Sequence, residues 1–428
     1  MSEKRKDNKG RVLRNGESQR KDGKYEYKYT DSSGERRSVY SWKLVETDKL
    51  PKGKRECVPL RELEKIAEQE TKSGLRTFEI KKCTLNEYFD QHMSKRALRL
   101  STRNLYLGTY ERHIRNSPLG IMLFTSIKSH HIKNLMIDAH MKKGLSFNSI
   151  SDIYVTLAQT FASAVKDKYI LENPTHGVLK EIKSFIIDDS KPKEALTKRQ
   201  QEIFSNYVAK DKFFNKWSAL FTFLLGTGCR IGEALALQWE DCDFKSGVIN
   251  ISRNLVYTYI GDRYDYHIGP PKNKSSIRKI PMLSEVRETL LNERERQMQS
   301  EIKSVEVCGY KNFVFINKYG NIRVSNEVSK ITKKVVCQYN NEEIERAKKE
   351  NREPELLPKI TPHIFRHTFC TRYCELENNV KLIQEVMGHS RIATTMNVYN
   401  TVTNDERKRS FMNLEKNMQI TSPKFLQG

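Results

Sequence analysis

Three short stretches in the second half of the chain combine residue types that can act on an anion. One holds Arg230 after a Gly-Thr-Gly-Cys run, another holds His363 and Arg366, and the third holds His389 with Tyr399 ten residues further on. Guanidinium groups stay charged at any working pH and offer forked sets of donors that fit phosphate oxygens. These stretches therefore predict an anion-binding site built from arginine and histidine.

Helix boundaries in the sequence indicate how the first two stretches are positioned. An apolar helix stops at the Gly-x-Gly turn before Arg230, and a new helix starts around this arginine. Thr361 as N-cap and Pro362 in the first turn predict another helix, on which His363 and Arg366 share one face. The positive end of a helix dipole lies close to both side chains, which favours a bound anion.

The third stretch predicts a helix end followed by a helix start. Gly388 and His389 close one helix, residues 392–395 open the next, and Tyr399 lies ten residues beyond His389. The remaining histidine of the second stretch, His367, is interpreted as a structural, hydrogen-bonded side chain.

Composition indicates the class of partner. The 428 residues include 76 Lys and Arg against 53 Asp and Glu, a net charge of +23, and this excess points to a polyanion such as nucleic acid. No apolar run reaches the roughly 20 residues that span a bilayer, and the N-terminus lacks the apolar core of a secretory signal. We therefore expect a cytoplasmic protein without a membrane anchor.

Cysteine and histidine spacing argues against disulfides and metal sites. The eight cysteines are scattered without a C-x-x-C pair, so neither a disulfide framework nor a zinc site is predicted. Six of the ten histidines fall between residues 92 and 176 without ligand spacing, and they are interpreted as surface or phosphate-contacting residues.

The chain divides into three segments. In residues 1–79, period-two alternation over 24–29 and 37–42 predicts a hairpin, 11–14 a third strand, and 60–72 a helix. A small basic sheet backed by a helix could enter a DNA major groove, although a protein-interaction module fits the same pattern.

Residues 80–188 predict a wholly helical segment. A capping-type start at Thr84 leads into the first helix, and further helices are predicted over 101–114, 131–141 and 149–166. A polar stretch at 183–194 has linker composition, and Thr197 with Gln200 marks the first helix of the third segment, 189–428.

The order, spacing and local sequence of the three stretches resemble the signature of tyrosine recombinases of the lambda-integrase type over residues 197–400. The N-terminal segment and the run TPHIFRHTFC are similar to integrases of Gram-positive conjugative transposons. The resemblance implies a multidomain α+β fold. Its parts are a sheet-plus-helix arm-binding domain (1–79), an all-helical core-binding domain (80–188) and a mainly helical catalytic domain with a small sheet (189–428).

The resemblance also implies a catalytic lysine on a β-hairpin between the first two stretches. The matching run is 270–281, where Lys272 precedes a predicted strand at 277–281 and is the preferred candidate. Lys274 is the alternative, because residues two apart in a strand share a face and alternation cannot separate them.

Family roles are carried over to the matching residues. Arg230 and Arg366 would stabilise the phosphate, Tyr399 would attack it to form a 3′-phosphotyrosyl bond, and His363 would accept the phenol proton. Lys272 would protonate the departing 5′-oxygen. His389 would donate a hydrogen bond to the phosphate, and Glu233 would orient its neighbours. The phosphotyrosine conserves bond energy, so no cofactor is expected, and the sequence has neither a Walker loop nor a two-metal acidic cluster.

Partners follow from the same resemblance. We expect double-stranded DNA with core and arm sites, a homo-tetramer exchanging strands through a Holliday junction, and an excision accessory factor as a further candidate partner. A tail helix at about 403–418, with Phe411 and Leu414 on one side, would dock on a neighbouring protomer or on its own domain. The alternative enzyme is a type IB topoisomerase, and the non-enzyme alternative is a DNA-binding accessory protein with a decayed site.

Overall fold

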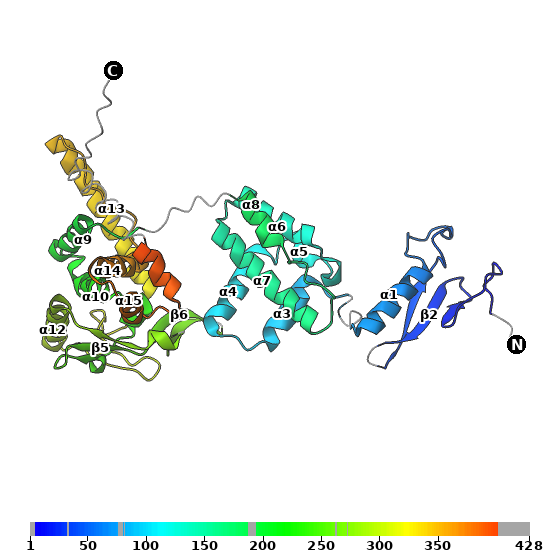
Figure 1. Cartoon of the computed structure of the whole chain (residues 1–428), viewed down its shortest axis with the longest axis horizontal. Helices are drawn as coiled ribbons and strands as arrows, with labels where there is room; N and C mark the ends of the chain where they lie inside the picture. Colours follow the sequence, from blue (N-terminus) through cyan, green and yellow to red (C-terminus); the bar gives the residue numbers. More distant parts are fainter. Residues whose placement is uncertain are drawn as a thin grey trace, which may run out of the picture. The chain divides into compact units, whose positions relative to one another are not determined.

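The structure is a computed structural model that describes residues 5–31, 34–75, 80, 82–186, 194–261, 263–271 and 273–400 (Figure 1). The chain separates into two compact units, Met1–Ser190 and Lys191–Gly428. Within the first unit, one apolar cluster spans residues 25–67 and a second spans residues 80–186. Among the described residues, no helix combines the length and the apolar character that crossing a membrane requires.

The N-terminal part is a three-stranded antiparallel sheet with one helix. The sheet has the order β1-β2-β3, and its core holds Tyr25 and Tyr27 from the central strand with Leu60 and Ala67 from the helix. The elements are β1 (Glu17–Gln19), β2 (Tyr25–Thr30), β3 (Arg36–Ser41) and α1 (Leu60–Ser73). The predicted hairpin and helix are confirmed.

The predicted strand at 11–14 is wrong, because the third strand lies at Glu17–Gln19. Val12 forms only an isolated bridge to Lys6. The Asp7 carboxylate explains the difference, since it accepts hydrogen bonds from the backbone N–H of Arg11 (2.7 Å) and from its Nε (2.8 Å). This tight local turn keeps the segment out of the sheet.

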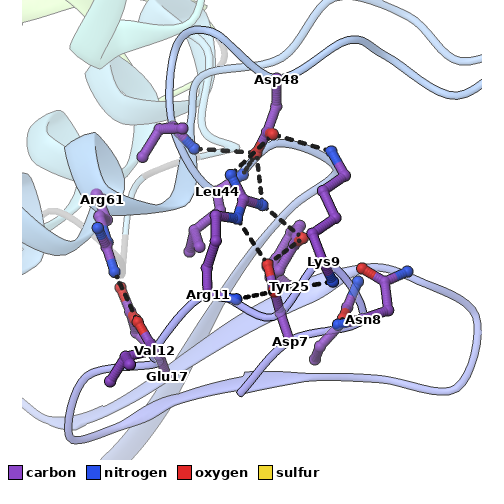
Figure 2. A network of polar contacts seen from close by, with 12 residues as sticks. Asp7, Asn8, Lys9, Arg11, Val12, Glu17, Tyr25, Leu44, Asp48 and Arg61 are labelled. Carbon is purple, nitrogen blue, oxygen red and sulfur yellow. Dashed lines mark hydrogen bonds and ion pairs between the residues drawn. The ribbon is translucent and has the colours of Figure 1, made fainter.

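Figure 2 shows that Arg11 joins the same turn to a distant loop. Its guanidinium Nη1 lies 2.9 Å from an Asp48 carboxylate oxygen, and the second Asp48 oxygen accepts from the backbone N–H of Leu44 at 2.8 Å. Burial acts to raise the pKa of Asp48, but the hydrogen bonds from Arg11, Lys9 and backbone N–H groups outweigh it and hold the pKa well below its usual range. The network fixes both loops against the sheet.

Residues 84–186 are helical, as predicted, around a core rich in aromatic side chains. Thr84 forms the capping box with Glu87, and Phe89 stacks on Tyr110 with ring centroids 3.6 Å apart. The helices are α3 (Leu85–Lys95), α4 (Leu100–His113), α5 (Pro118–Ile121), α6 (Ser129–Lys143), α7 (Phe147–Lys166) and α8 (Val178–Phe185). Sequence reasoning missed α5 and α8, and α8 occupies the first residues of the predicted linker at 183–194.

The second unit is mainly helical with two small sheets. The apolar helix α10 is buried between α12 and α14, as its apolar composition requires. The helices are α9 (Lys198–Lys210), α10 (Ser218–Thr227), α11 (Ile231–Leu235), α12 (Ser284–Gln299), α13 (Ser325–Glu350), α14 (Pro362–Leu376) and α15 (Val380–Met387), followed by helical residues 392–400. The mixed, mainly helical fold class is confirmed.

The sheets of the second unit are antiparallel. One has the order β4-β5-β8, and the other is the hairpin β6-β7. The strands are β4 (Cys242–Asp243), β5 (Val248–Ile251), β6 (Asn254–Ile260), β7 (Arg263–Gly269) and β8 (Arg278–Pro281). Strand β8 contacts α15, which itself packs on α14, so the small sheet reaches the helices of the second and third sequence stretches.

Candidate active site

Arg230 lies at the junction of α10 and α11, as the sequence predicted. Helix α10 ends at Gly228 with φ +61°, where a Cβ atom would stand 2.4 Å from the Phe369 ring, so the turn requires glycine. Arg230 is the N-cap residue of α11, and its Nη1 lies 2.6 Å from a Glu233 carboxylate oxygen. Its Nη2 donates to the Gly388 carbonyl at 3.0 Å. The first stretch is thereby tied to the third.

Arg366 binds the same two turns from α14. Its side chain is buried, and it donates from Nη1 to the Gly228 carbonyl at 2.8 Å and from Nη2 to the Met387 carbonyl. Burial, with the nearby charge of Arg230, lowers the pKa of Arg366 to about 10, so the group is still a cation at neutral pH. The two arginines predicted to act together are brought together.

His363 is an exposed residue in the otherwise buried first turn of α14. Thr361 is the N-cap residue and Pro362 the first helical residue, as predicted, although the Thr361 side chain makes no capping hydrogen bond. His363 is exposed and lies near enough to His389 to help lower its pKa. His367 is hydrogen-bonded to Thr371 at 3.2 Å, in agreement with its structural interpretation.

His389 follows the left-handed Gly388 that ends α15. Its Nδ1 lies 2.9 Å from the Thr395 hydroxyl, one turn into the final described helix. Burial lowers the pKa of His389 to about 3, and the positive charges of Arg366, Arg230, Arg278 and His363 act in the same direction. The imidazole is therefore neutral at pH 7 and can donate one hydrogen bond while it accepts another.

Tyr399 lies on the helical residues 392–400, one turn beyond Thr395. Its half-buried ring packs on an apolar cluster that includes Cys370 from α14 and Met387 from α15. Met387 also offers the carbonyl that Arg366 binds. The phenol is therefore carried by a helix that contacts His389 and borders the arginine site.

Only one of the two candidate lysines lies among the described residues. Lys272, the preferred candidate, lies outside the described residues. Lys274 is exposed and opens the short 3-10 helix Lys274–Ser276. The strand predicted from Ile277 begins at Arg278, so Lys274 is not a strand residue and the argument from alternation does not apply to it.

Arg278 and Thr395 are site residues that sequence reasoning missed. Arg278 lies on β8 and forms an ion pair with Glu233 at 3.0 Å, with both side chains almost fully buried. It precedes the buried Ile280 by two positions, and in a strand this spacing places both residues on one face. This two-residue spacing was the signal in the sequence that the Arg278 side chain points inward.

The charges of the site do not balance. Arg230, Arg278 and Arg366 bring three positive charges, while Glu233 brings one carboxylate, whose pKa burial raises and the arginines Arg278 and Arg230 lower more strongly. The surplus attracts an anion to the exposed side of Arg230. Among the described residues, no group of three His, Cys, Asp or Glu is arranged to hold a metal ion.

Comparison with known proteins identifies the family. Residues 1–71 match the DNA-binding domain of Tn916 integrase, and residues 194–406 match the phage integrase family. The chain is 37% identical to the transposases of Tn916 from Enterococcus faecalis and of Tn1545 from Streptococcus pneumoniae, over 98% of each protein. A solved structure of the Tn1549 transposon integrase in complex with transposon right end DNA is similar with a TM-score of 0.64 and 30% identity, covering 76% of this chain and 99% of that one. The chain therefore belongs to the phage integrase family of tyrosine recombinases and is a site-specific DNA recombinase.

Proposed function

We propose that this protein excises and integrates a conjugative transposon through a 3′-phosphotyrosyl intermediate on Tyr399. The observation that carries the proposal is the convergence of Arg230, Arg366 and His389 on one site, beside the helix of Tyr399. The transposon integrases and transposases to which the chain is similar support the mobile element as its substrate.

The proposed reaction is an exchange of one phosphoester for another. The Tyr399 oxygen forms a bond to phosphorus while the bond from phosphorus to the 5′-oxygen breaks, and the phenol proton passes to His363. A lysine, Lys272 or else Lys274, gives a proton to the departing 5′-oxygen. Negative charge grows on the non-bridging oxygens, and removing one donor from such a site typically costs about 3 kcal/mol of transition-state stabilisation.

The exposure of His363 is consistent with its role as a base. Because the His363 side chain is exposed in the first turn of α14, it can meet a phenol that approaches from the helical residues 392–400. His389 is instead neutral and lies half-buried near several cations, so it is better suited to donate a hydrogen bond to phosphate than to accept a proton.

DNA binding is proposed for all three segments. The match of residues 1–71 to an integrase DNA-binding domain supports an arm-site role for 1–79, and the helical segment 80–188 would hold the core site. Residues 189–428 would carry the chemistry. We place the activity in the cytoplasm, where the DNA of a bacterial cell lies.

Assembly is proposed as a homo-tetramer on DNA, because two duplexes exchange four strands through a Holliday junction. The predicted tail helix, with Phe411 and Leu414, lies outside the described residues. It would join neighbouring protomers in trans. An excision accessory factor is a further proposed partner, and excision by the purified chain alone tests whether one is required. The molecular mass of the protein, measured alone and bound to paired element ends, gives the number of protomers in the assembly.

Trapping on a suicide substrate tests the chemistry. A nicked duplex carrying an element end should form an SDS-resistant adduct with the wild-type chain, and peptide mapping should find the nucleotide on Tyr399. Y399F should bind the same DNA and form no adduct, and an adduct of this variant would overturn the nucleophile assignment. Relaxation of a supercoiled plasmid that lacks element ends would favour the topoisomerase alternative.

A further inference from the structure

The Arg278 side chain bonds polar groups from three separate segments of the second unit. Its side chain is 5% exposed. Nη2 lies 3.0 Å from a Glu233 carboxylate oxygen, Nε donates to the Val386 carbonyl at 2.7 Å, and Nη1 donates to the Ser276 carbonyl at 3.0 Å. One guanidinium thus joins α11, the end of α15 and the loop before β8.

Glu233 connects Arg278 to Arg230. The Glu233 side chain is 1% exposed, and its other carboxylate oxygen accepts from Arg230 Nη1 at 2.6 Å. The oxygen that faces Arg278 also accepts from the backbone N–H of Arg230 at 3.0 Å. Glu233 therefore orients Arg230 while Arg278 holds Glu233 from the opposite side.

The turn after α15 connects Arg278 to His389. A Cβ atom on Gly388 would stand 3.0 Å from Arg278 Cδ and 3.1 Å from its Nη1, so the arginine side chain packs directly against this glycine. Arg230 holds the carbonyl of the same glycine, and His389 is the next residue. The position of the His389 backbone thus depends on a turn that Arg278 supports.

We propose that Arg278 is a positioning residue for strand cleavage, which aligns Arg230 through Glu233 and His389 through the turn at Gly388. The inference rests on the proposed function, because it assigns Arg278 a role in the same site. In this role Arg278 itself contacts no DNA phosphate. It also anchors Ser276, two residues after Lys274, so the loop of the candidate lysines is held to the same centre.

A buried ion pair that serves stability alone is the competing explanation, and replacing one partner of such a pair usually destabilises a fold. The test therefore compares variants of the full-length chain by more than activity. R278M removes the charge, R278K keeps a charge for Glu233 but lacks the forked donors, and E233Q removes the carboxylate. R253M is the matched control, because Arg253 pairs with Asp241 and stacks on Tyr310 without touching a site residue.

We expect R278M to bind the element-end duplex within about twofold of wild type and to cleave the suicide substrate at least tenfold more slowly in single turnover. R278K should recover part of the rate. Combining R278M with E233Q should slow cleavage no further than the slower single variant, since coupled residues are not additive. The cleavage of R278M should also recover toward high pH, because a Glu233 without Arg278 ionises at higher pH.

Three results would overturn the inference: a cleavage rate of R278M equal to that of R253M, additive losses in the double variant, or a slow variant whose pH profile matches wild type. If R278M fails to fold, as judged by its thermal transition, the folded R278K and E233Q variants carry the same comparison. Wild-type adduct formation at Tyr399 is measured in the same assay, so failure of the proposed function is seen separately.

Discussion

The Nδ1 atom of His389 lies 2.9 Å from the hydroxyl oxygen of Thr395, so the histidine of the site is bonded to the helix that carries Tyr399. Thr395 is fully buried. If the Thr395 hydroxyl donates to Nδ1, the proton of the neutral ring stays on Nε2, where it can be donated to a phosphate. One hydrogen bond would then set the tautomer of His389 and its distance from the nucleophile's helix together.

Replacing Thr395 by valine keeps the shape of the side chain and removes the hydroxyl. We expect T395V to cleave a suicide substrate roughly tenfold more slowly, which corresponds to about 1.4 kcal/mol for a lost hydrogen bond. Affinity for the element-end duplex should not change, since Thr395 is buried. T395S, which retains the hydroxyl, is the control and should cleave faster than T395V. Equal rates for T395V and wild type would exclude a role for this bond.

The two candidate lysines can be separated by the chemistry of the leaving group. A substrate with sulfur in place of the bridging 5′-oxygen releases a thiolate, which needs no proton because thiols have a pKa near 8.5. We expect K272A to cleave the oxygen substrate slowly and the sulfur substrate at the wild-type rate, and K274A to cleave both normally. Rescue of K274A instead would move the general acid to Lys274, and rescue of neither variant would remove the lysine from proton transfer.

The parts of the fold that the sequence predicted are those decided by local interactions. Thr84 with Glu87 and Thr197 with Gln200 form capping boxes at the predicted helix starts, because each box involves residues three apart. The hairpin of residues 25–41 also follows from a turn and an alternating pattern. The missed helices α5 and α8 are only four and eight residues long, so each offers periodicity too few residues to act on.

Two other failures involve contacts between segments far apart in the chain. The segment predicted as a strand at 11–14 is held by Asp48 as well as by its local turn at Asp7, and the sequence does not reveal that the Asp48 carboxylate bonds Arg11. Arg278 was missed for the same reason, since its partners Glu233 and Val386 lie 45 and 108 residues away. The arginines and histidines with family spacing were found through resemblance. Arg278 had only its two-residue spacing from the buried Ile280, which indicates an inward-facing side chain but not its partners.

His389 makes the stability of the second unit sensitive to acid. Its pKa is about 3 in the folded chain, against 6.5 for an ordinary histidine. Between these values the unfolded chain binds a proton that the folded chain does not, so the free energy of unfolding falls as the pH is lowered through this window. We expect the midpoint temperature of thermal unfolding to fall less between pH 7 and pH 4.5 in H389Q than in wild type. An equal fall in both proteins would mean that His389 is not the source of this pH dependence.

The Asp48 network predicts a second acid-sensitive element, in the N-terminal sheet. Asp48 is buried and pairs with Arg11 at 2.9 Å and Lys9 at 3.0 Å, and the lowered pKa of this carboxyl means that its contribution is present at neutral pH and is lost as the pH falls below about 4. D48N keeps the shape but removes the charge, and we expect it to lower the local stability of residues 25–41 by roughly 2 kcal/mol at pH 7. The change in local stability is measured by hydrogen exchange of the backbone amides of these strands in the full-length chain. E35Q is the control, since Glu35 pairs with Arg37 at an exposed site where such pairs contribute less than about 1 kcal/mol. If D48N and E35Q exchange alike, the network does not stabilise the sheet, because the buried carboxylate would then contribute no more than an exposed one.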